Sequence, residues 1–185
     1  MNPWRAGGLG LALLLGVQAV SAAPRITPAA DAAAAPAFTH PLPAHWINSP
    51  PLTWAQLRGE VVLLEFWTFA CYNCYRSIPW LKTLPDRFGS QGFRIVSVHT
   101  PEFDFERERT AVEAKVQEHG LRFPVMLDND FSYWKALNNR FWPAFYLIDR
   151  QGRIRAHFVG ETHAGDGNAR AMQAAISQLL AEPRP

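Results

Sequence analysis

The sequence predicts an α/β fold in which a central mixed β-sheet has helices on both faces. Three observations predict it. Short apolar and β-branched runs alternate along the chain with segments of helical period, as in strand–helix–strand units. Two strands joined by a tight turn come later, followed by a closing amphipathic helix. The chain has 185 residues, of which 48% are hydrophobic, and this is enough to bury one core.

The longest apolar run, at 61–69, predicts a buried strand, and the helical spacing after it predicts a helix at 72–88. Pro79 lies inside this helix, so a kink is expected there. A second buried strand is predicted at 93–99, and a charged helix at 106–119. The later elements are a strand at 123–127, a short helix capped by 128–130, strands at 141–148 and 154–159, and a helix at 168–180.

The N-terminus has the pattern of a secretory signal peptide at residues 1–22. An apolar segment at 9–20 precedes the small residues 21–23, and cleavage is expected after Ala22. The alternative is an uncleaved anchor, but the apolar segment is shorter than the roughly 17 to 25 residues that span a bilayer. The protein is therefore expected in the periplasm or secreted.

Residues 23–43 are rich in Ala and Pro and contain few large apolar groups. This composition predicts a semi-extended linker whose only role is distance. The folded domain is predicted at 44–182. An exported chain meets oxidising conditions, in which a disulfide persists.

Cys71 and Cys74 are the only cysteines, and they lie where the predicted strand gives way to the helix. A bridge between them closes a loop too small to stabilise the fold much by the entropic model, so a structural staple is a poor explanation. Free backbone N–H groups and the helix dipole favour the thiolate of Cys71, which is expected to be the exposed nucleophile. Cys74, one turn further in, faces the interior and is expected to resolve the mixed disulfide.

Glu65 is a lone carboxylate in the otherwise apolar run. Burial raises the pKa of such a group, and a carboxylate with a raised pKa is suited to take the proton of Cys74 during resolution. The structural alternative is that Glu65 points to an edge of the sheet or pairs with a basic residue such as Lys82.

Several segments carry a family likeness. A C-x-x-C that opens a helix after a buried strand, Pro79 five residues after the second cysteine, and Pro143 at the start of a later strand together resemble the thioredoxin fold. The phrases FWTFACYNC, VHTPEF, DNDFSYW and FWPAFYLIDRQGRIR resemble the exported TlpA-like branch, especially the C-terminal thioredoxin-like domain of DipZ proteins, a group often placed under the redoxin heading. The fold implied is the three-layer thioredoxin-like fold.

This resemblance implies a thiol–disulfide oxidoreductase in which Cys71 takes the nucleophile's place and Cys74 the resolving place. Glu65 takes the place of the buried acid beneath the active site, six residues before the first cysteine. Pro143 takes the place of the cis-proline that faces the disulfide. The implied partners are protein thiols and disulfides.

The sequence departs from thioredoxin at three positions. Tyr72 and Asn73 replace its Gly-Pro, and Trp142 replaces the small or β-branched residue usual before Pro143. These three residues, together with Pro143, are expected to form the surface that a substrate meets. The role implied for the branch is reducing, in cytochrome c maturation or rescue of oxidised cysteines, with electrons from a membrane thiol reductant of the CcdA or DsbD type. A monomer is expected.

Other kinds of site are excluded by composition and spacing. The net charge of +2 is spread without a block of Lys or Arg, which argues against nucleic acid. Tyr75 follows the C-x-x-C where haem attachment needs His. The histidines lack the spacing of zinc ligands, so neither a metal nor a cofactor is expected. His99, which lies near Glu102, is interpreted as a satisfied loop histidine.

Two other functions remain open. A thiol peroxidase is suggested by the redoxin heading, but the pattern P-x-x-x-T-x-x-C needs proline where Leu64 stands, although Thr68 is correctly placed. A non-catalytic module is the other alternative, in which the two thiols bind copper or a partner. Soft thiolates are suitable ligands for Cu(I), but a site with only two such ligands binds the metal with modest affinity.

Overall fold

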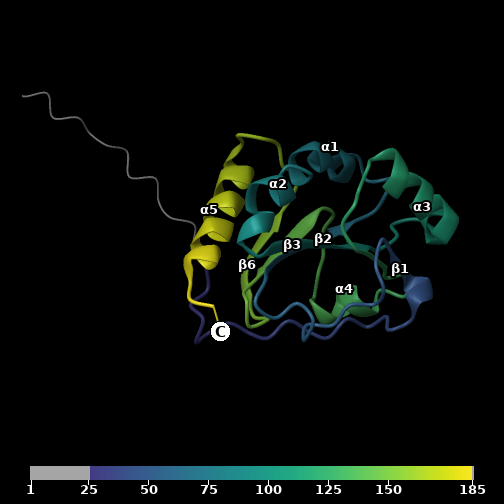
Figure 1. The fold of residues 1–185 in the computed structure, drawn as a ribbon. Helices are drawn as coiled ribbons and strands as arrows, with labels where there is room; N and C mark the ends of the chain where they lie inside the picture. The colour runs from purple at the N-terminus through teal and green to yellow at the C-terminus, as the bar shows by residue number, and fades with distance from the viewer. Residues whose placement is uncertain (1–25, 185) are drawn as a thin grey trace, which may run out of the picture.

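The computed structural model describes residues 26–184, whose strands form one six-stranded sheet in the order β1-β4-β3-β2-β5-β6 (Figure 1). The strands β2, β3 and β4 run parallel to one another, whereas β5 is antiparallel to both β2 and β6. The sheet is therefore mixed, as predicted. The strands are β1 Trp46–Ile47, β2 Val61–Trp67, β3 Phe93–His99, β4 Val125–Leu127, β5 Ala144–Ile148 and β6 Ile154–Val159.

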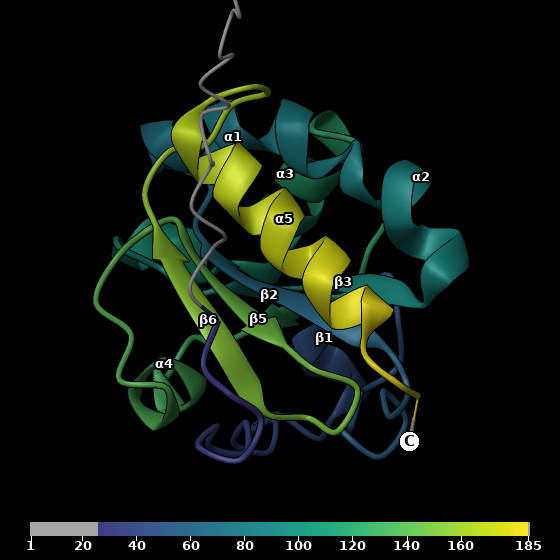
Figure 2. The same cartoon turned by 90° about the vertical axis from the view of Figure 1, so that its left-hand side faces the viewer.

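Helices lie on both faces of the sheet, which confirms the three-layer arrangement (Figures 1 and 2). The α-helices are α1 Tyr72–Leu81, α2 Leu84–Phe88, α3 Arg109–Glu118, α4 Ser132–Ala136 and α5 Gly167–Ala181. Short 3₁₀ turns occupy Pro43–His45, Gly89–Gln91 and Asp104–Arg107. α1, α2, α3 and α5 share one apolar cluster with the sheet, and α4 packs on the opposite face.

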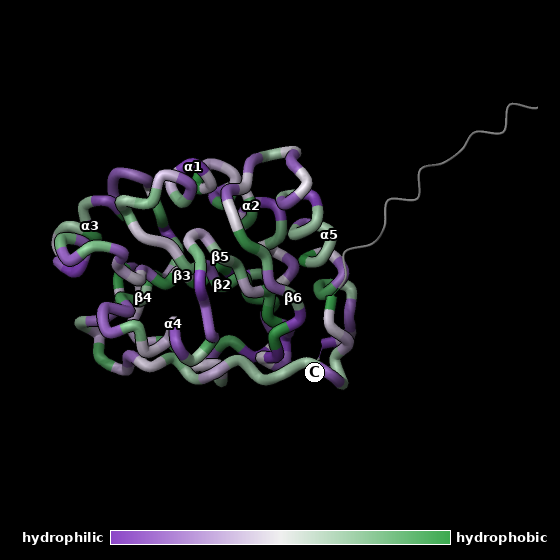
Figure 3. Tube along the Cα trace, turned by 180° about the vertical axis from the view of Figure 1, so that it is seen from behind, coloured by the Kyte–Doolittle hydropathy of each residue, from purple (hydrophilic) through white to green (hydrophobic). Residues whose placement is uncertain are grey.

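β2 lies near the middle of the sheet, and every one of its residues is buried. Side chains alternate between the two faces of a strand, so Leu63 and Trp67 enter the cluster beneath α1, and Leu64 and Phe66 enter the other cluster. This two-sided burial explains why the run is apolar except for Glu65, since a strand covered on both faces has no solvent-facing side. In Figure 3 the sheet lies between α1 above and α4 below, with α5 at its right-hand side.

The helix predicted at 72–88 is two helices rather than one kinked helix. Pro79 lies within α1, which continues to Leu81, and the break comes before α2. Pro85 accounts for this position, because it has no N–H to bond the carbonyl of Leu81 but is well tolerated in the first turn of a new helix.

Residues 26–43, predicted as part of an unpacked linker, are extended but pack against the domain, and we call them the N-terminal strap. Ala35 N donates to Gly152 O at 2.8 Å, and Ile154 N donates to Ala33 O at 2.8 Å. The ring of Phe38 stacks on Trp54 at 4.9 Å between centroids. The expectation of a spacer without contacts therefore does not hold for this part of the segment, because main-chain bonds, the ring of Phe38 and the contact of His40 with Asp128 anchor it despite its Ala- and Pro-rich composition.

The strap and α4 together cover the face of the sheet opposite α1 (Figure 1). The predicted signal peptide, residues 1–22, lies outside the described residues. Within 26–184 no helix is both long and apolar enough to cross a membrane.

Candidate active site

Cys71 and Cys74 form a disulfide at the start of α1, just beyond the carboxyl end of β2. Cys71 is the N-cap residue of α1, and its Sγ accepts a hydrogen bond of 3.2 Å from Cys74 N. Cys71 is 9% exposed, whereas Cys74 has no exposed surface. The two cysteines are therefore unequal, and Cys71 is the more exposed of the two.

The chain between β2 and α1 makes a tight turn that sets this geometry. Cys71 N donates to Thr68 O at 3.3 Å, and Ala70 between them is exposed. The first N–H groups of a helix have no partner within it, so they present a positive field to the sulfur at the N-cap. A developing thiolate on Cys71 is stabilised by this arrangement.

Glu65 is fully buried in β2, between Ser97 of β3 and Phe145 of β5 in the sheet register. Ser97 Oγ donates a hydrogen bond of 3.0 Å to Glu65 Oε2. Oε1 has no hydrogen-bond partner among the described residues. Burial raises the pKa of Glu65 to about 8, although the hydrogen bond from Ser97 opposes the shift.

Glu65 lies on the face of the sheet that carries the disulfide. Side chains two residues apart on a strand share a face, and Leu63 and Trp67 on either side belong to the cluster that includes Cys71 and Cys74. Neither structural alternative for Glu65 is observed. The residue is central rather than at an edge, and Lys82 Nζ instead donates to His119 O at 2.8 Å.

The peptide bond between Trp142 and Pro143 is cis, as the resemblance implies. Ala144 pairs with Phe66 in the antiparallel register, so Pro143 comes next to the end of β2, where the turn to the disulfide begins. Pro143 O accepts a hydrogen bond from Gly160 N at 2.9 Å. That carbonyl is therefore already paired within the chain.

Trp142 is half-buried and tied to its surroundings. Its Nε1 donates to Thr100 O at 3.0 Å, and its ring packs on Trp134 with 4.2 Å between centroids. Trp142 thus links the cis-proline loop to the loop after β3.

Tyr72 and Asn73 are both exposed on the first turn of α1. Tyr72 is 58% exposed, with the guanidinium of Arg76 over its ring at 5.1 Å from the centroid and Tyr75 edge-on at 5.3 Å. The two residues that depart from thioredoxin thus stand at the surface beside Cys71.

Glu106 is a buried carboxylate next to the disulfide that the sequence reasoning missed. Its Oε1 accepts hydrogen bonds from Thr68 Oγ and from Ala70 N, the latter at 2.8 Å. Its Oε2 accepts from Glu102 N at 2.7 Å and Phe103 N at 2.8 Å. Burial alone would raise the pKa of Glu106, but these hydrogen bonds outweigh it and hold the pKa below its ordinary value.

The sequence offered only a weak signal for Glu106. It is the third residue of the 3₁₀ turn Asp104–Arg107, and a glutamate at that position often reaches back to the N–H before the turn. That pattern predicts the bond from Phe103 N. The bonds from Thr68 and Ala70 join segments more than thirty residues apart, so no local pattern reveals them.

His99, at the end of β3, is fully buried beside this cluster, with Nε2 at 3.3 Å from Thr68 Oγ. Because the Thr68 hydroxyl donates to Glu106, it accepts from a protonated Nε2 of His99. Burial lowers the pKa of His99 to about 4, although the charge of Glu106 acts in the opposite direction. The imidazole is therefore neutral, and its nearby acid is Glu106 rather than Glu102, whose side chain is exposed.

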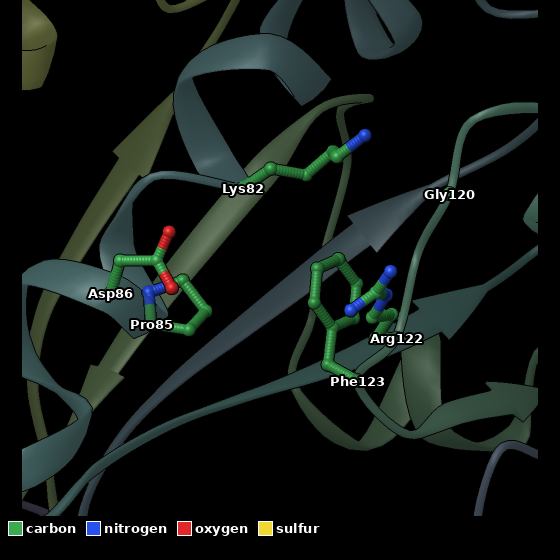
Figure 4. A pocket seen from close by; sticks show the side chains of 6 residues that line it. All are labelled: Lys82, Pro85, Asp86, Gly120, Arg122 and Phe123. Atoms are coloured by element: carbon green, nitrogen blue, oxygen red, sulfur yellow. The ribbon is translucent and has the colours of Figure 1, made fainter.

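A hollow of about 340 Å³ elsewhere on the described surface is lined by none of these residues. Figure 4 shows Lys82, Pro85 and Asp86 on one side of it, and Arg122 and Phe123 across from them. A second cluster, of His40, Asp128 and Asp130, has the composition of a metal site. Both oxygens of Asp128 already accept helix N–H groups, from Tyr133 and Trp134 at 2.9 Å, so the cluster anchors the strap to α4.

The model of the Redoxin family matches residues 29–176 of the chain. Protein DipZ of Mycobacterium tuberculosis is 35% identical over 143 residues, which cover 76% of this chain and 20% of DipZ. The chain therefore spans about a fifth of that relative's length. The thiol-disulfide oxidoreductase YkuV of Bacillus subtilis is 28% identical over 138 residues, which cover 74% of this chain and 88% of YkuV.

Among solved structures, the thioredoxin-like superfamily protein SPOA0173 superposes with a TM-score of 0.71 and 27% identity, covering 82% of this chain and 99% of that one. The family match spans most of the described residues, and the fold places a C-x-x-C disulfide at the N-terminus of α1. The chain thus belongs to the Redoxin family and has a TlpA-like thioredoxin fold.

Proposed function

We propose that the protein is an exported reductant of protein disulfides, with Cys71 as nucleophile, Cys74 as resolving cysteine and Glu65 as proton acceptor. The observation that carries this proposal is the asymmetry of the pair. Cys71, at the N-terminus of a helix, keeps 9% of its surface exposed, whereas Cys74 has none and lies on the side of the sheet that holds Glu65.

The reaction begins from the dithiol form. The Cys71 thiolate attacks one sulfur of a substrate disulfide, which forms a mixed disulfide and releases the other substrate sulfur as a thiolate. The Cys74 thiolate then attacks Cys71 Sγ, and the second substrate sulfur leaves. Two electrons pass to the substrate, and the protein is left with the disulfide seen in the structure.

Glu65 supplies the proton acceptor for the second step. A buried thiol holds its proton, so Cys74 needs a base before it can attack. A carboxyl whose pKa is near 8 exchanges a proton with a thiol at little cost in free energy, because the two acidities are close. The unpaired Oε1 leaves Glu65 with a free position for that proton.

The substrate surface in this proposal is formed by Tyr72, Asn73, Trp142 and Pro143. Tyr72 and Asn73 stand exposed beside Cys71, and the cis-proline loop reaches the same end of β2. An extended substrate segment pairs with backbone at such a site, a recurrent way of binding peptides.

The finer parts of the proposal rest on the sequence and the relatives. Export follows from the signal pattern at 1–22. A membrane thiol reductant of the CcdA or DsbD type would return electrons to the disulfide, and the substrates would be disulfides or oxidised cysteines of proteins, in cytochrome c maturation or cysteine rescue. We propose that the protein acts as a monomer.

The test compares wild type with Cys71→Ser in insulin reduction and in peroxide consumption, together with the redox potential of the pair. We expect wild type to reduce insulin and Cys71→Ser to be inactive in this assay. We expect the redox potential of the cysteine pair to be low, as a reductant requires. Peroxide turnover that exceeds insulin reduction would favour the peroxidase. Stoichiometric Cu(I) binding without disulfide turnover would favour the binding module.

One feature of the structure weighs against the peroxidase. The hydroxyl of Thr68, which the peroxidase pattern requires, already donates to Glu106 and lies against His99 in a fully buried position. It is therefore not free to bind a peroxide oxygen.

A further inference from the structure

Two aromatic rings stand unusually exposed in the loop that follows β3. Phe103 is 50% exposed and Phe105 is 59% exposed. Their rings stack with 5.6 Å between centroids, and Phe105 contacts the half-buried Phe69 at 5.8 Å. We call Phe69, Phe103 and Phe105 the aromatic platform. Large apolar rings on a surface mark interaction sites more often than chance when they are grouped in this way.

The platform is fixed to the loop that carries the disulfide. Oε2 of Glu106 accepts a hydrogen bond from Phe103 N, and Oε1 accepts one from Ala70 N, which belongs to the residue directly before Cys71. One ionised side chain thus joins the two segments from within. Charge-assisted bonds of this kind are about twice as strong as neutral ones, so the platform keeps its position relative to Cys71.

One ring of the platform, that of Phe69, belongs to the turn that leads from β2 to Cys71. Phe69 lies two residues before Cys71 and also lines a hollow of about 270 Å³, together with Tyr75 and His119. His119 stacks on Tyr75 at 6.1 Å between centroids. Lys115 and Glu118, which pair with each other, complete the lining, so the hollow is part aromatic and part charged and includes Tyr75 of α1.

The charge around the platform is negative. Three exposed carboxylates lie around the two phenylalanines in the sequence: Glu102, Asp104 and Glu108. Arg107 is the one exposed cation from 102 to 108. Arg107 is paired with Asp104 at 3.1 Å. The exposed side chains of this loop thus carry a net charge of −2. A basic partner is favoured there.

We propose that the aromatic platform binds an apolar side chain of an extended substrate polypeptide, close to its reacting cysteine and next to a basic residue. The proposal rests on the proposed function, since it names the class of protein disulfide that the site prefers. Burial of the apolar side chain against three rings supplies affinity, and the acidic loop selects the basic neighbour. Thiol–disulfide exchange then proceeds at Cys71 as described above.

The test measures the second-order rate constant for single-turnover reduction of peptide mixed disulfides by the reduced protein. Each of three peptides of equal length carries one cysteine in a mixed disulfide with 2-mercaptoethanol. The first has Phe and Lys near the cysteine, the second has Ser in place of Phe, and the third has Glu in place of Lys. Hydroxyethyl disulfide reports the intrinsic reactivity of Cys71.

We expect wild type to reduce the Phe–Lys peptide at least about tenfold faster than either of the other two, the size of effect that one buried side chain produces. The double variant Phe103→Ser/Phe105→Ser should lose this preference and keep its rate with hydroxyethyl disulfide. Leu42→Ser, which removes an equally exposed apolar side chain from the strap, should change nothing.

Equal rates of wild type with the three peptides would overturn the proposal, as would a preference that survives in the double variant. Either result leaves the oxidoreductase function standing, because the peptides are still reduced. Peptide reduction no faster than with Cys71→Ser would instead remove the proposed function and this inference with it. Because Phe103 and Phe105 are exposed, the double variant is expected to fold, and circular dichroism checks this.

Discussion

Ser97 donates a hydrogen bond of 3.0 Å from Oγ to Glu65 Oε2, across the parallel strands β3 and β2 in the centre of the sheet. It is the one hydrogen bond that the buried carboxyl makes among the described residues. The bond lowers the pKa of Glu65, and burial raises it more, to about 8. Both the rate of resolution and the stability of the protein should therefore depend on pH through Glu65.

Glu65→Gln should slow the resolution of the mixed disulfide by about 100-fold, the usual contribution of a positioned base. In wild type the rate should rise with pH and level off above about 8, as Glu65 ionises. The variant should lack this inflection. Rapid-quench measurement of mixed disulfide decay across pH checks it, and Ser97→Ala should move the inflection to higher pH. A profile identical in Glu65→Gln and wild type would sink the role of proton acceptor.

The same carboxyl should make stability depend on pH. Its pKa is raised on folding, so its contribution to stability is complete below 4.5 and is lost as the pH rises toward about 8. Across that window the unfolded chain releases the proton that the folded chain retains. The free energy of unfolding should fall by about 1.4 kcal/mol per pH unit relative to Glu65→Gln. Urea unfolding of both proteins across pH measures the difference, and parallel curves would contradict the burial of a neutral acid.

Cys74→Ser should accumulate the mixed disulfide between Cys71 and its substrate. The buried Cys74 is the group proposed to attack Cys71 Sγ, and serine at that position cannot. Non-reducing electrophoresis and mass spectrometry of the variant after incubation with a disulfide substrate detect the adduct. Cys71→Ser is the matched control and should form none. An adduct on Cys74 in that control would reverse the assigned order of the two cysteines.

Glu106→Gln should destabilise the protein by about 2 to 4 kcal/mol at neutral pH. Glutamine replaces one carboxylate oxygen with an NH2 group, which is a donor and faces the N–H or O–H donors that had bonded that oxygen. The pKa of Glu106 is lowered on folding, so its contribution is present above its ordinary pKa of 4.5 and is lost as the pH falls below it. Urea unfolding measures this. Glu102→Gln, at an exposed side chain four residues away, is the control and should be close to neutral.

Phe38→Ala should cost about 2 kcal/mol of stability, because the ring packs against three aromatic neighbours and leaves a gap when removed. Those neighbours are Trp46, Trp54 and Tyr133, with centroids 4.9 to 5.4 Å away. Urea unfolding followed by near-ultraviolet circular dichroism measures both the loss and the change around the tryptophans. Leu42→Ala, at an exposed position of the strap, serves as the control. Equal stability of the two variants would mean that the strap contributes nothing to the fold.

Most of the sheet and the position of the disulfide were predictable from residue patterns. β3 was predicted with its observed bounds and β6 likewise, because β-branched runs bounded by turns define short strands well. The joint of β2 and α1 was visible as a change of hydrophobic period at Cys71. The sequence predicted one helix with a kink at Pro79, whereas the helix is interrupted after Leu81, where Pro85 has no N–H to bond the Leu81 carbonyl.

Local pattern, then, determined the strands, the helices and the two thiols at their joint, because each of these depends on neighbours a few residues away along the chain. The packed strap, the proximity of Pro143 to the disulfide turn and the cluster around Glu106 came from long-range contacts that no local pattern encodes. The bond between Ser97 and Glu65 is of the same kind, since it depends on the register of two strands. A buried carboxyl acquires its pKa from such neighbours, and only the folded chain brings them together.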